Sequence, residues 1–185
     1  MTIKGIPKNN EFLNLIIELV KLFKPGTYVE LGVKRGFIFN RISPLVQKAV
    51  AVDSCGLKGV NASDNVAFFH MTTDEFATIW EGTIDMLFID ADHSKRQVLK
   101  DIDNMLPFIR DYTGLILLHD TYPINEPLTQ DGYCSNAWEA AHEIRVTPRY
   151  LSQVEIVTLP GPFFGLSILR KVPFSGHLEW KGAKE

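Results

Sequence analysis

The segment that most constrains the fold is a short apolar run near the middle of the chain, Ile84-Asp-Met-Leu-Phe-Ile-Asp90. Only one charged side chain interrupts the run before it ends in an aspartate. A near-continuous apolar run of this length is typical of a strand that helices cover on both faces, as in a parallel sheet. The run therefore predicts a central strand of a parallel sheet.

Strand-like and helix-like segments alternate along the chain on both sides of this run. The β-rich runs cover residues 27–31, 49–53, 66–70, 84–90 and 115–118, and helical periodicity covers residues 10–23, 37–46, 94–109 and 137–144, with a short helix opening at 74–76. Two further β-rich runs, 154–159 and 165–170, flank a turn-rich link and predict an antiparallel hairpin. This order predicts a doubly wound, Rossmann-like α/β fold with a mostly parallel seven-stranded sheet and a C-terminal antiparallel hairpin.

The length of 185 residues suits one substantial core and is too short for two ordinary domains. We expect a single domain over residues 1–185, with an N-terminal helix within residues 1–26 and a loosely held tail at 173–185. The polar, turn-rich segment 121–136 is too long for a simple connection, so we expect it to form a functional loop over the site.

Composition excludes several classes of partner. A net charge of -3 and a pI near 6.0 argue against nucleic acid, which requires clustered lysine and arginine side chains. No stretch approaches the roughly 18 apolar residues that span a bilayer, and the first residues lack an apolar signal core, so we expect no membrane partner and a cytoplasmic location. Cys55 and Cys134 lie too far apart to suggest a zinc site or a disulfide framework. A small-molecule partner is therefore favoured.

The first candidate for chemistry is the turn that follows the strand at 27–31. Glu30, Gly32 and Gly36 form an E-x-G-x-x-x-G pattern, and Asp53 ends the next strand. The pattern is neither the G-x-G-x-x-G dinucleotide fingerprint nor a phosphate-binding P-loop. Ligands in open α/β sheets bind outside the carboxyl ends of the strands, which favours a nucleoside-binding turn here. An ordinary tight strand-to-helix turn is the alternative.

The second candidate is a group of acids and imidazoles at two later strand ends. Asp90, Asp92 and His93 follow one strand, and His119 and Asp120 follow another. If these strands are neighbours, Asp90, His119 and Asp120 could hold one divalent cation. Carboxylates suit Mg²⁺, whereas an imidazole beside them also suits Mn²⁺, Fe²⁺ or Zn²⁺. The identity of the metal stays open.

These two groups together resemble a known enzyme family. The glycine turn with Asp53 resembles motif I of class I S-adenosylmethionine-dependent methyltransferases. The D-A-D-H-S segment with the later His-Asp pair resembles the macrocin O-methyltransferase and cephalosporin-hydroxylase-like family, and more distantly the catechol and caffeoyl-CoA O-methyltransferases, over residues 27–172. The resemblance implies an S-adenosylmethionine site that contains Glu30, Gly32, Gly36, Asp53, Asp74 and Asp90, and a metal site at Asp90, His119 and Asp120. The family has an acidic pair where this chain has His119 and Asp120. His119 is therefore either a nitrogen ligand of the metal or a sign that the metal site is weakened or lost.

The implied activity is O-methylation of a small hydroxylated acceptor, such as a sugar or a natural-product hydroxyl. The acceptor must lose a proton, and the candidate bases are Asp92 and His93, with a helix N-cap as the alternative role for Asp92 and also for Asp74. Two other functions stay open: a non-catalytic, methyltransferase-like domain that binds the cofactor, and a metal-dependent hydroxylase-like protein. The sequence also leaves open whether a homodimer completes the site.

Overall fold

The computed structural model describes residues 12–56 and 58–172. Seven strands form one sheet in the order β3-β2-β1-β4-β5-β7-β6. The strands are β1 (Thr27–Leu31), β2 (Lys48–Val52), β3 (Val66–Phe69), β4 (Met86–Ile89), β5 (Leu115–His119), β6 (Val154–Leu159) and β7 (Leu166–Lys171). The first five are parallel, whereas β7 pairs antiparallel with β5 and with β6. The predicted fold class is confirmed, and β4 lies at the centre of the sheet as its apolar run predicts.

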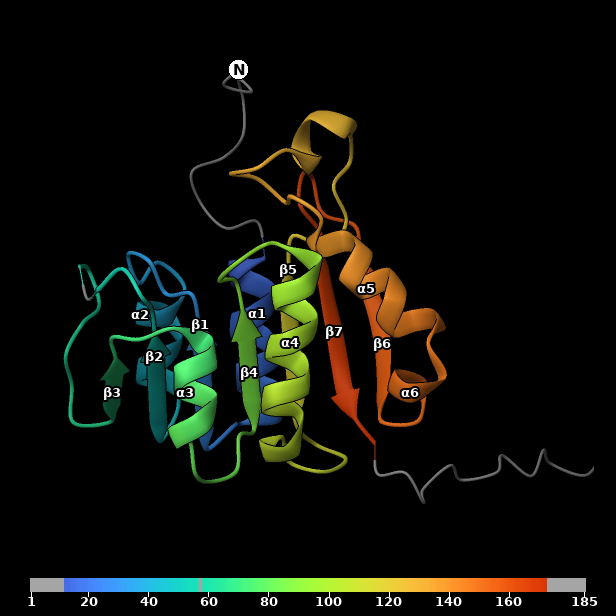
Figure 1. The fold of residues 1–185 in the computed structure, drawn as a ribbon. Coiled ribbons are helices and arrows are strands. Elements are labelled where there is room, and N and C mark those ends of the chain that lie inside the picture. The colour runs from blue at the N-terminus through green and yellow to red at the C-terminus, as the bar shows by residue number, and fades with distance from the viewer. Residues whose placement is uncertain (1–11, 57, 173–185) are drawn as a thin grey trace, which may run out of the picture.

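Helices cover both faces of the sheet (Figure 1). They are α1 (Leu13–Phe23), α2 (Phe39–Ile42), α3 (Thr73–Ile79), α4 (Lys95–Met105), α5 (Ala137–Val146) and α6 (Pro148–Leu151). Alternate residues of the strands face the two layers, because successive side chains of a strand point to opposite faces. In β4, Met86 and Phe88 pack in the layer of α1 and α2, while Leu87 and Ile89 pack in the layer of α3, α4 and α5.

Several helix boundaries differ from the sequence prediction. The expected helix at 37–46 shortens to α2 and continues as a 3₁₀ turn, Ser43–Leu45, and α4 passes into a second 3₁₀ turn, Leu106–Phe108. Both 3₁₀ turns contain a proline, which cannot donate the next helical hydrogen bond. Helix α6 was not predicted. Residues 10 and 11 of the expected first helix and the expected tail at 173–185 lie outside the described residues.

The parallel strands place their carboxyl ends along one edge of the sheet. This is the upper edge in Figure 1, and the segment between β5 and α5 extends above it. That segment contains a 3₁₀ turn, Glu126–Thr129, and otherwise has no regular structure, in agreement with the predicted loop. In the part of the chain that the structure describes, no helix has both the length and the apolar character needed to cross a membrane.

Candidate active site

An open cavity of about 1570 Å³ lies at the carboxyl ends of the parallel strands. All ten side chains or turn positions predicted from the sequence line it: Glu30, Gly32, Gly36, Asp53, Asp74, Asp90, Asp92, His93, His119 and Asp120. The loop that precedes α5 contributes Asp131, Gly132, Tyr133 and Ser135. The fold therefore brings the two predicted groups of residues to one cavity.

The two glycines of the first turn permit close contacts within the protein. Gly32 has a φ of 88°, and a Cβ atom there would lie 2.3 Å from the carbonyl oxygen of Asp90. Gly36 has a φ of 70°, and its Cβ would lie 2.9 Å from the carbonyl oxygen of Gly59. Both glycines border the cavity, but it is the protein backbone packed against them that leaves no room for a larger side chain. Sequence reasoning expected close approach of a ligand and missed these internal contacts.

Asp53 is fixed directly after β2 by two backbone N–H groups. The amide of Lys34 donates to Oδ2 at 2.6 Å, and the amide of Cys55 donates to Oδ1 at 2.6 Å. The first of these bonds joins Asp53 to the glycine turn after β1. Because each carboxylate oxygen has further acceptor capacity, Asp53 can still accept hydrogen bonds from a ligand in the cavity.

Glu30 lies below the turn and is only 2% exposed. Burial raises its pKa to about 8, and the negative charge of Asp90 adds to this shift. The hydroxyl of Tyr28, which donates to Glu30 Oε2 at 2.6 Å, acts in the opposite direction. Glu30 is therefore mostly uncharged at neutral pH in this structure.

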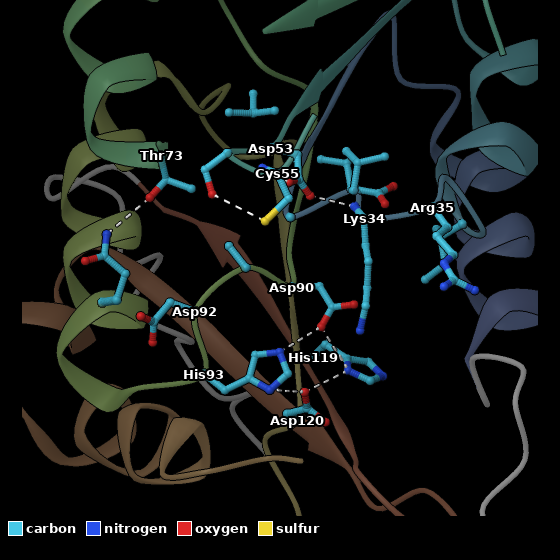
Figure 2. A pocket seen from close by; sticks show the side chains of 18 of the residues that line it. Lys34, Arg35, Asp53, Cys55, Thr73, Asp90, Asp92, His93, His119 and Asp120 are labelled. Atoms are coloured by element: carbon cyan, nitrogen blue, oxygen red, sulfur yellow. Dashed lines mark hydrogen bonds and ion pairs between the residues drawn. The ribbon is translucent and has the colours of Figure 1, made fainter. Parts of the chain in front are cut away.

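The acids and imidazoles at the ends of β4 and β5 form a compact cluster, which Figure 2 shows from close by. His119 Nδ1 lies 3.2 Å from Asp90 Oδ1 and 3.2 Å from Asp120 Oδ2. His93 also contacts both acids: its Nε2 lies 3.4 Å from Asp90 Oδ1 and its Nδ1 lies 3.0 Å from Asp120 Oδ2. Each imidazole thus connects the two carboxylates.

The contacts within this cluster shift the pKa values of its acids and imidazoles. Burial lowers the pKa of His93, but the hydrogen bonds and charges of Asp120 and Asp90 outweigh it and raise the pKa to about 10. Burial likewise lowers the pKa of His119. The same two acids outweigh this effect and raise the pKa well above its ordinary value. Burial raises the pKa of Asp120, yet the two histidines hold it below its usual range. The cluster is a set of mutually stabilised charges.

The loop before α5 supports this cluster through groups that sequence reasoning missed. His93 Nδ1 donates a hydrogen bond to the backbone carbonyl of Tyr133, and the thiol of Cys134 donates to Asp120 Oδ1 at 3.4 Å. Asp120 itself has a φ of 61°, in the left-handed region that residues other than glycine rarely adopt. A backbone carbonyl carries no sequence signal, so only the topology reveals the first of these contacts.

Two predicted residues have structural roles beside the cavity. Asp92 Oδ1 accepts the amide of Ser94 at 2.7 Å, and Ser94 is the N-cap of α4. The carboxylate of Asp92 lies apart from the acid–imidazole cluster in Figure 2. Asp74 is not the N-cap of α3, because Thr72 occupies that position and forms a capping box with Glu75. Asp74 instead accepts from Lys100 Nζ at 2.6 Å.

A family comparison identifies the type of domain that carries this cavity. The family described as methyltransferase domain matches residues 29–121, from the turn-forming strand β1 through the cluster residue Asp120. The chain belongs to this methyltransferase family. The match covers half of the chain and includes all ten predicted site residues. The expectation of a methyltransferase is therefore confirmed.

Solved methyltransferase structures share the fold at low sequence identity. The O-methyltransferase TomG from Streptomyces achromogenes, in complex with S-adenosylmethionine, is 10% identical with a TM-score of 0.65, covering 92% of this chain and 83% of its own. The O-methyltransferase from Bacillus cereus, in complex with S-adenosylhomocysteine, is 15% identical with a TM-score of 0.59, covering 91% and 84%. The N-methyltransferase NodS from Bradyrhizobium japonicum, also in complex with S-adenosylhomocysteine, is 13% identical with a TM-score of 0.59, covering 89% and 88%. No curated protein matches the chain.

Proposed function

We propose that this methyltransferase transfers a methyl group from S-adenosylmethionine to a hydroxyl oxygen of a small acceptor, such as a sugar or a natural product. The observation that carries the proposal is the placement of the glycine turn, Asp53 and the four-residue acid–imidazole cluster around one cavity. The first two suit the cofactor, and the cluster suits removal of a proton from the acceptor.

The cofactor half of the cavity has suitable donors and acceptors. Asp53 is held by two backbone amides with acceptor capacity to spare, which suits the paired hydroxyls of a ribose. Asp90 lines the adjoining part of the cavity, where its negative charge favours a sulfonium and an α-ammonium, and the mostly uncharged Glu30 lines it as well. The residues present therefore fit this cofactor. When bound, S-adenosylmethionine supplies an electrophilic methyl group.

The acceptor atom is inferred from the cluster, because similar folds occur in both O- and N-methyltransferases. In the transfer, a C–O bond forms as the S–C bond breaks, and the hydroxyl proton passes to the neutral imidazole of His93, which is the minor form at neutral pH because its pKa is raised to about 10. His93 is the more exposed imidazole of the cluster, with 29% of its side chain exposed against 10% for His119. We therefore assign contact with the acceptor hydroxyl to His93, with Asp90 and Asp120 holding its ring and balancing its charge.

As a second part of this proposal, Asp90, His119 and Asp120 hold a divalent cation. One ligand atom from each residue lies within 4.8 Å of the others, so the donors converge as a metal site requires. The imidazole favours a transition metal over Mg²⁺. Such a cation would supply positive charge beside the acceptor oxygen. Of the two imidazoles of the cluster, His119 belongs to this converging donor set and His93 does not.

Calorimetry of S-adenosylmethionine binding tests the central proposal. We expect the wild-type protein to bind the cofactor and Asp53→Ala to bind it at least about tenfold more weakly. The variant lacks the charged carboxylate that accepts hydrogen bonds from the ribose hydroxyls. Asp64→Ala, which removes an exposed acid outside the cavity, is the matched control and should bind as the wild type does. Repeating the titration with a chelator separates cofactor binding from metal binding. Absence of binding to the wild-type protein in both titrations would overturn the proposal.

A further inference from the structure

Lys34 has an unusual conformation at the centre of the glycine turn. Its φ is 51°, in the left-handed region that a lysine adopts only at an energetic cost. Its amide donates to Asp53 Oδ2, so the turn and the acid after β2 hold the backbone in this conformation. Figure 2 shows the side chain running along the cavity from Asp53 toward Asp90 and His119. The turn thus directs a lysine side chain along the cavity.

Lys34 is a cation in a cavity whose charged lining side chains are mainly acidic. Among the residues that the structure describes, seven acidic side chains line the cavity: Glu30, Asp53, Asp74, Asp90, Asp92, Asp120 and Asp131. Apart from the two cluster histidines, the lining cations are Lys34, Arg35 and Arg41. Arg41 lies over the ring of Phe37, 5.8 Å from its centroid, and Arg35 lies to the side of the acid cluster in Figure 2. In Figure 2, Lys34 extends toward Asp90, an acid that the cofactor proposal uses, whereas Arg35 does not.

In the described part of the chain, the ammonium of Lys34 forms no ion pair. Within residues 12–56 and 58–172, no carboxylate lies within 4.0 Å of its Nζ atom. The amino-acid end of S-adenosylmethionine carries a carboxylate as well as an ammonium. The lining acids favour the ammonium but repel the carboxylate, so a cation is needed where that carboxylate lies.

We propose that the ammonium of Lys34 binds the carboxylate at the amino-acid end of the cofactor. This inference rests on the proposed S-adenosylmethionine site and assigns a cofactor-recognition role to a residue within it. An anionic acceptor is the competing partner for the same ammonium, and the experiment must separate the two.

Two ligands and three variants make the test specific. The ligands are S-adenosylhomocysteine and its decarboxylated analogue, S-adenosyl-3-thiopropylamine, which keeps the amine and lacks the carboxylate. Lys34→Met keeps a long side chain without charge, and Lys34→Gly removes the side chain at a φ that glycine adopts readily, which protects the test against misfolding. Lys58→Met, an exposed lysine that does not line the cavity, is the control.

Calorimetry should then show a loss of affinity that depends on the carboxylate. We expect Lys34→Met and Lys34→Gly to bind S-adenosylhomocysteine about 10- to 100-fold more weakly, because a charge-assisted hydrogen bond is lost, and to bind the analogue within about twofold of the wild type. An equal loss for both ligands, or an unchanged affinity for S-adenosylhomocysteine, would overturn the assignment. If the wild-type protein bound neither ligand, the proposed function itself would fail, which is a distinct result.

Discussion

The backbones of Gly32 and Asp90 lie in contact, and this contact joins the turn after β1 to the end of β4. A Cβ atom on Gly32 would lie 2.3 Å from the carbonyl oxygen of Asp90 and 2.5 Å from the Cα atom of Ala91. A side chain at position 32 would have to displace the backbone that carries the Asp90 carboxylate. The proposed cofactor turn and the acid–imidazole cluster are therefore mechanically coupled.

Gly32→Ala should accordingly damage both halves of the site. A left-handed φ alone costs an alanine about 1–2 kcal/mol, and the overlap with Asp90 adds to that cost. Gly132→Ala measures the cost of the left-handed φ alone, because Gly132 has the same φ of 88° and a Cβ atom there would meet no other atom within 4 Å. Denaturant unfolding should show a clearly larger loss of stability for Gly32→Ala than for Gly132→Ala. Equal losses would show that the contact with Asp90 is unimportant.

The two predicted bases can be separated by conservative substitutions. His93→Gln should lower kcat by about 100-fold or more, the usual contribution of a general acid or base, with little effect on cofactor affinity. Asp92→Asn should stay within about tenfold of wild-type kcat, because the carboxylate of Asp92 accepts a helix amide and lies apart from the cluster. Steady-state kinetics with a methyl acceptor measures both. The reverse order of effects would transfer the assignment to Asp92.

Asp120→Asn should separate the metal from the cofactor. Asparagine tolerates the left-handed φ of 61° at this position, so the backbone is preserved while a charged ligand is lost. We expect Mn²⁺ or Zn²⁺ affinity and metal-stimulated turnover to fall by about 10- to 100-fold, with S-adenosylhomocysteine affinity nearly unchanged. Calorimetry with each ligand alone gives the two affinities, and an assay with and without added metal gives the metal-stimulated turnover. An equal loss of cofactor affinity would contradict the division into two sites.

Sequence reasoning located the strands well and selected residues that the fold brings to one cavity, and both results have physical causes. The run 27–31 coincides with β1, because β-favouring, largely buried side chains make up most of it and the glycine after it stops the pattern. Strand order then brings Asp90 and Asp120 together, since β4 and β5 are parallel neighbours. The contacts of Tyr133 and Cys134 were not predictable, because a long loop approaches the cluster through geometry that no local pattern encodes.

Asp101 illustrates the same limit and leads to a stability prediction. It lies on the inner side of α4 between Val98 and Met105, and the apolar periodicity of that helix gave no reason to expect a buried acid. The side chain is 1% exposed, and its Oδ1 accepts from the hydroxyl of Thr73 at 2.7 Å and from Gln97 Nε2 at 2.9 Å. Burial raises the pKa of Asp101 to about 6, and these two hydrogen bonds act against that shift.

Because the pKa of Asp101 is higher in the folded protein than its ordinary value of 3.8, folding favours the protonated acid. Its contribution to stability is fully present below that ordinary value and is lost as the pH rises through about 6. Asp101→Asn keeps an oxygen for Thr73 and Gln97 and carries no charge. We expect it to match the wild type at low pH and to exceed its free energy of unfolding by about 3 kcal/mol at pH 8. Urea unfolding across this pH range measures the difference, with Asp64→Asn as an exposed control. A difference that stays constant with pH would show that ionisation of Asp101 does not cause it.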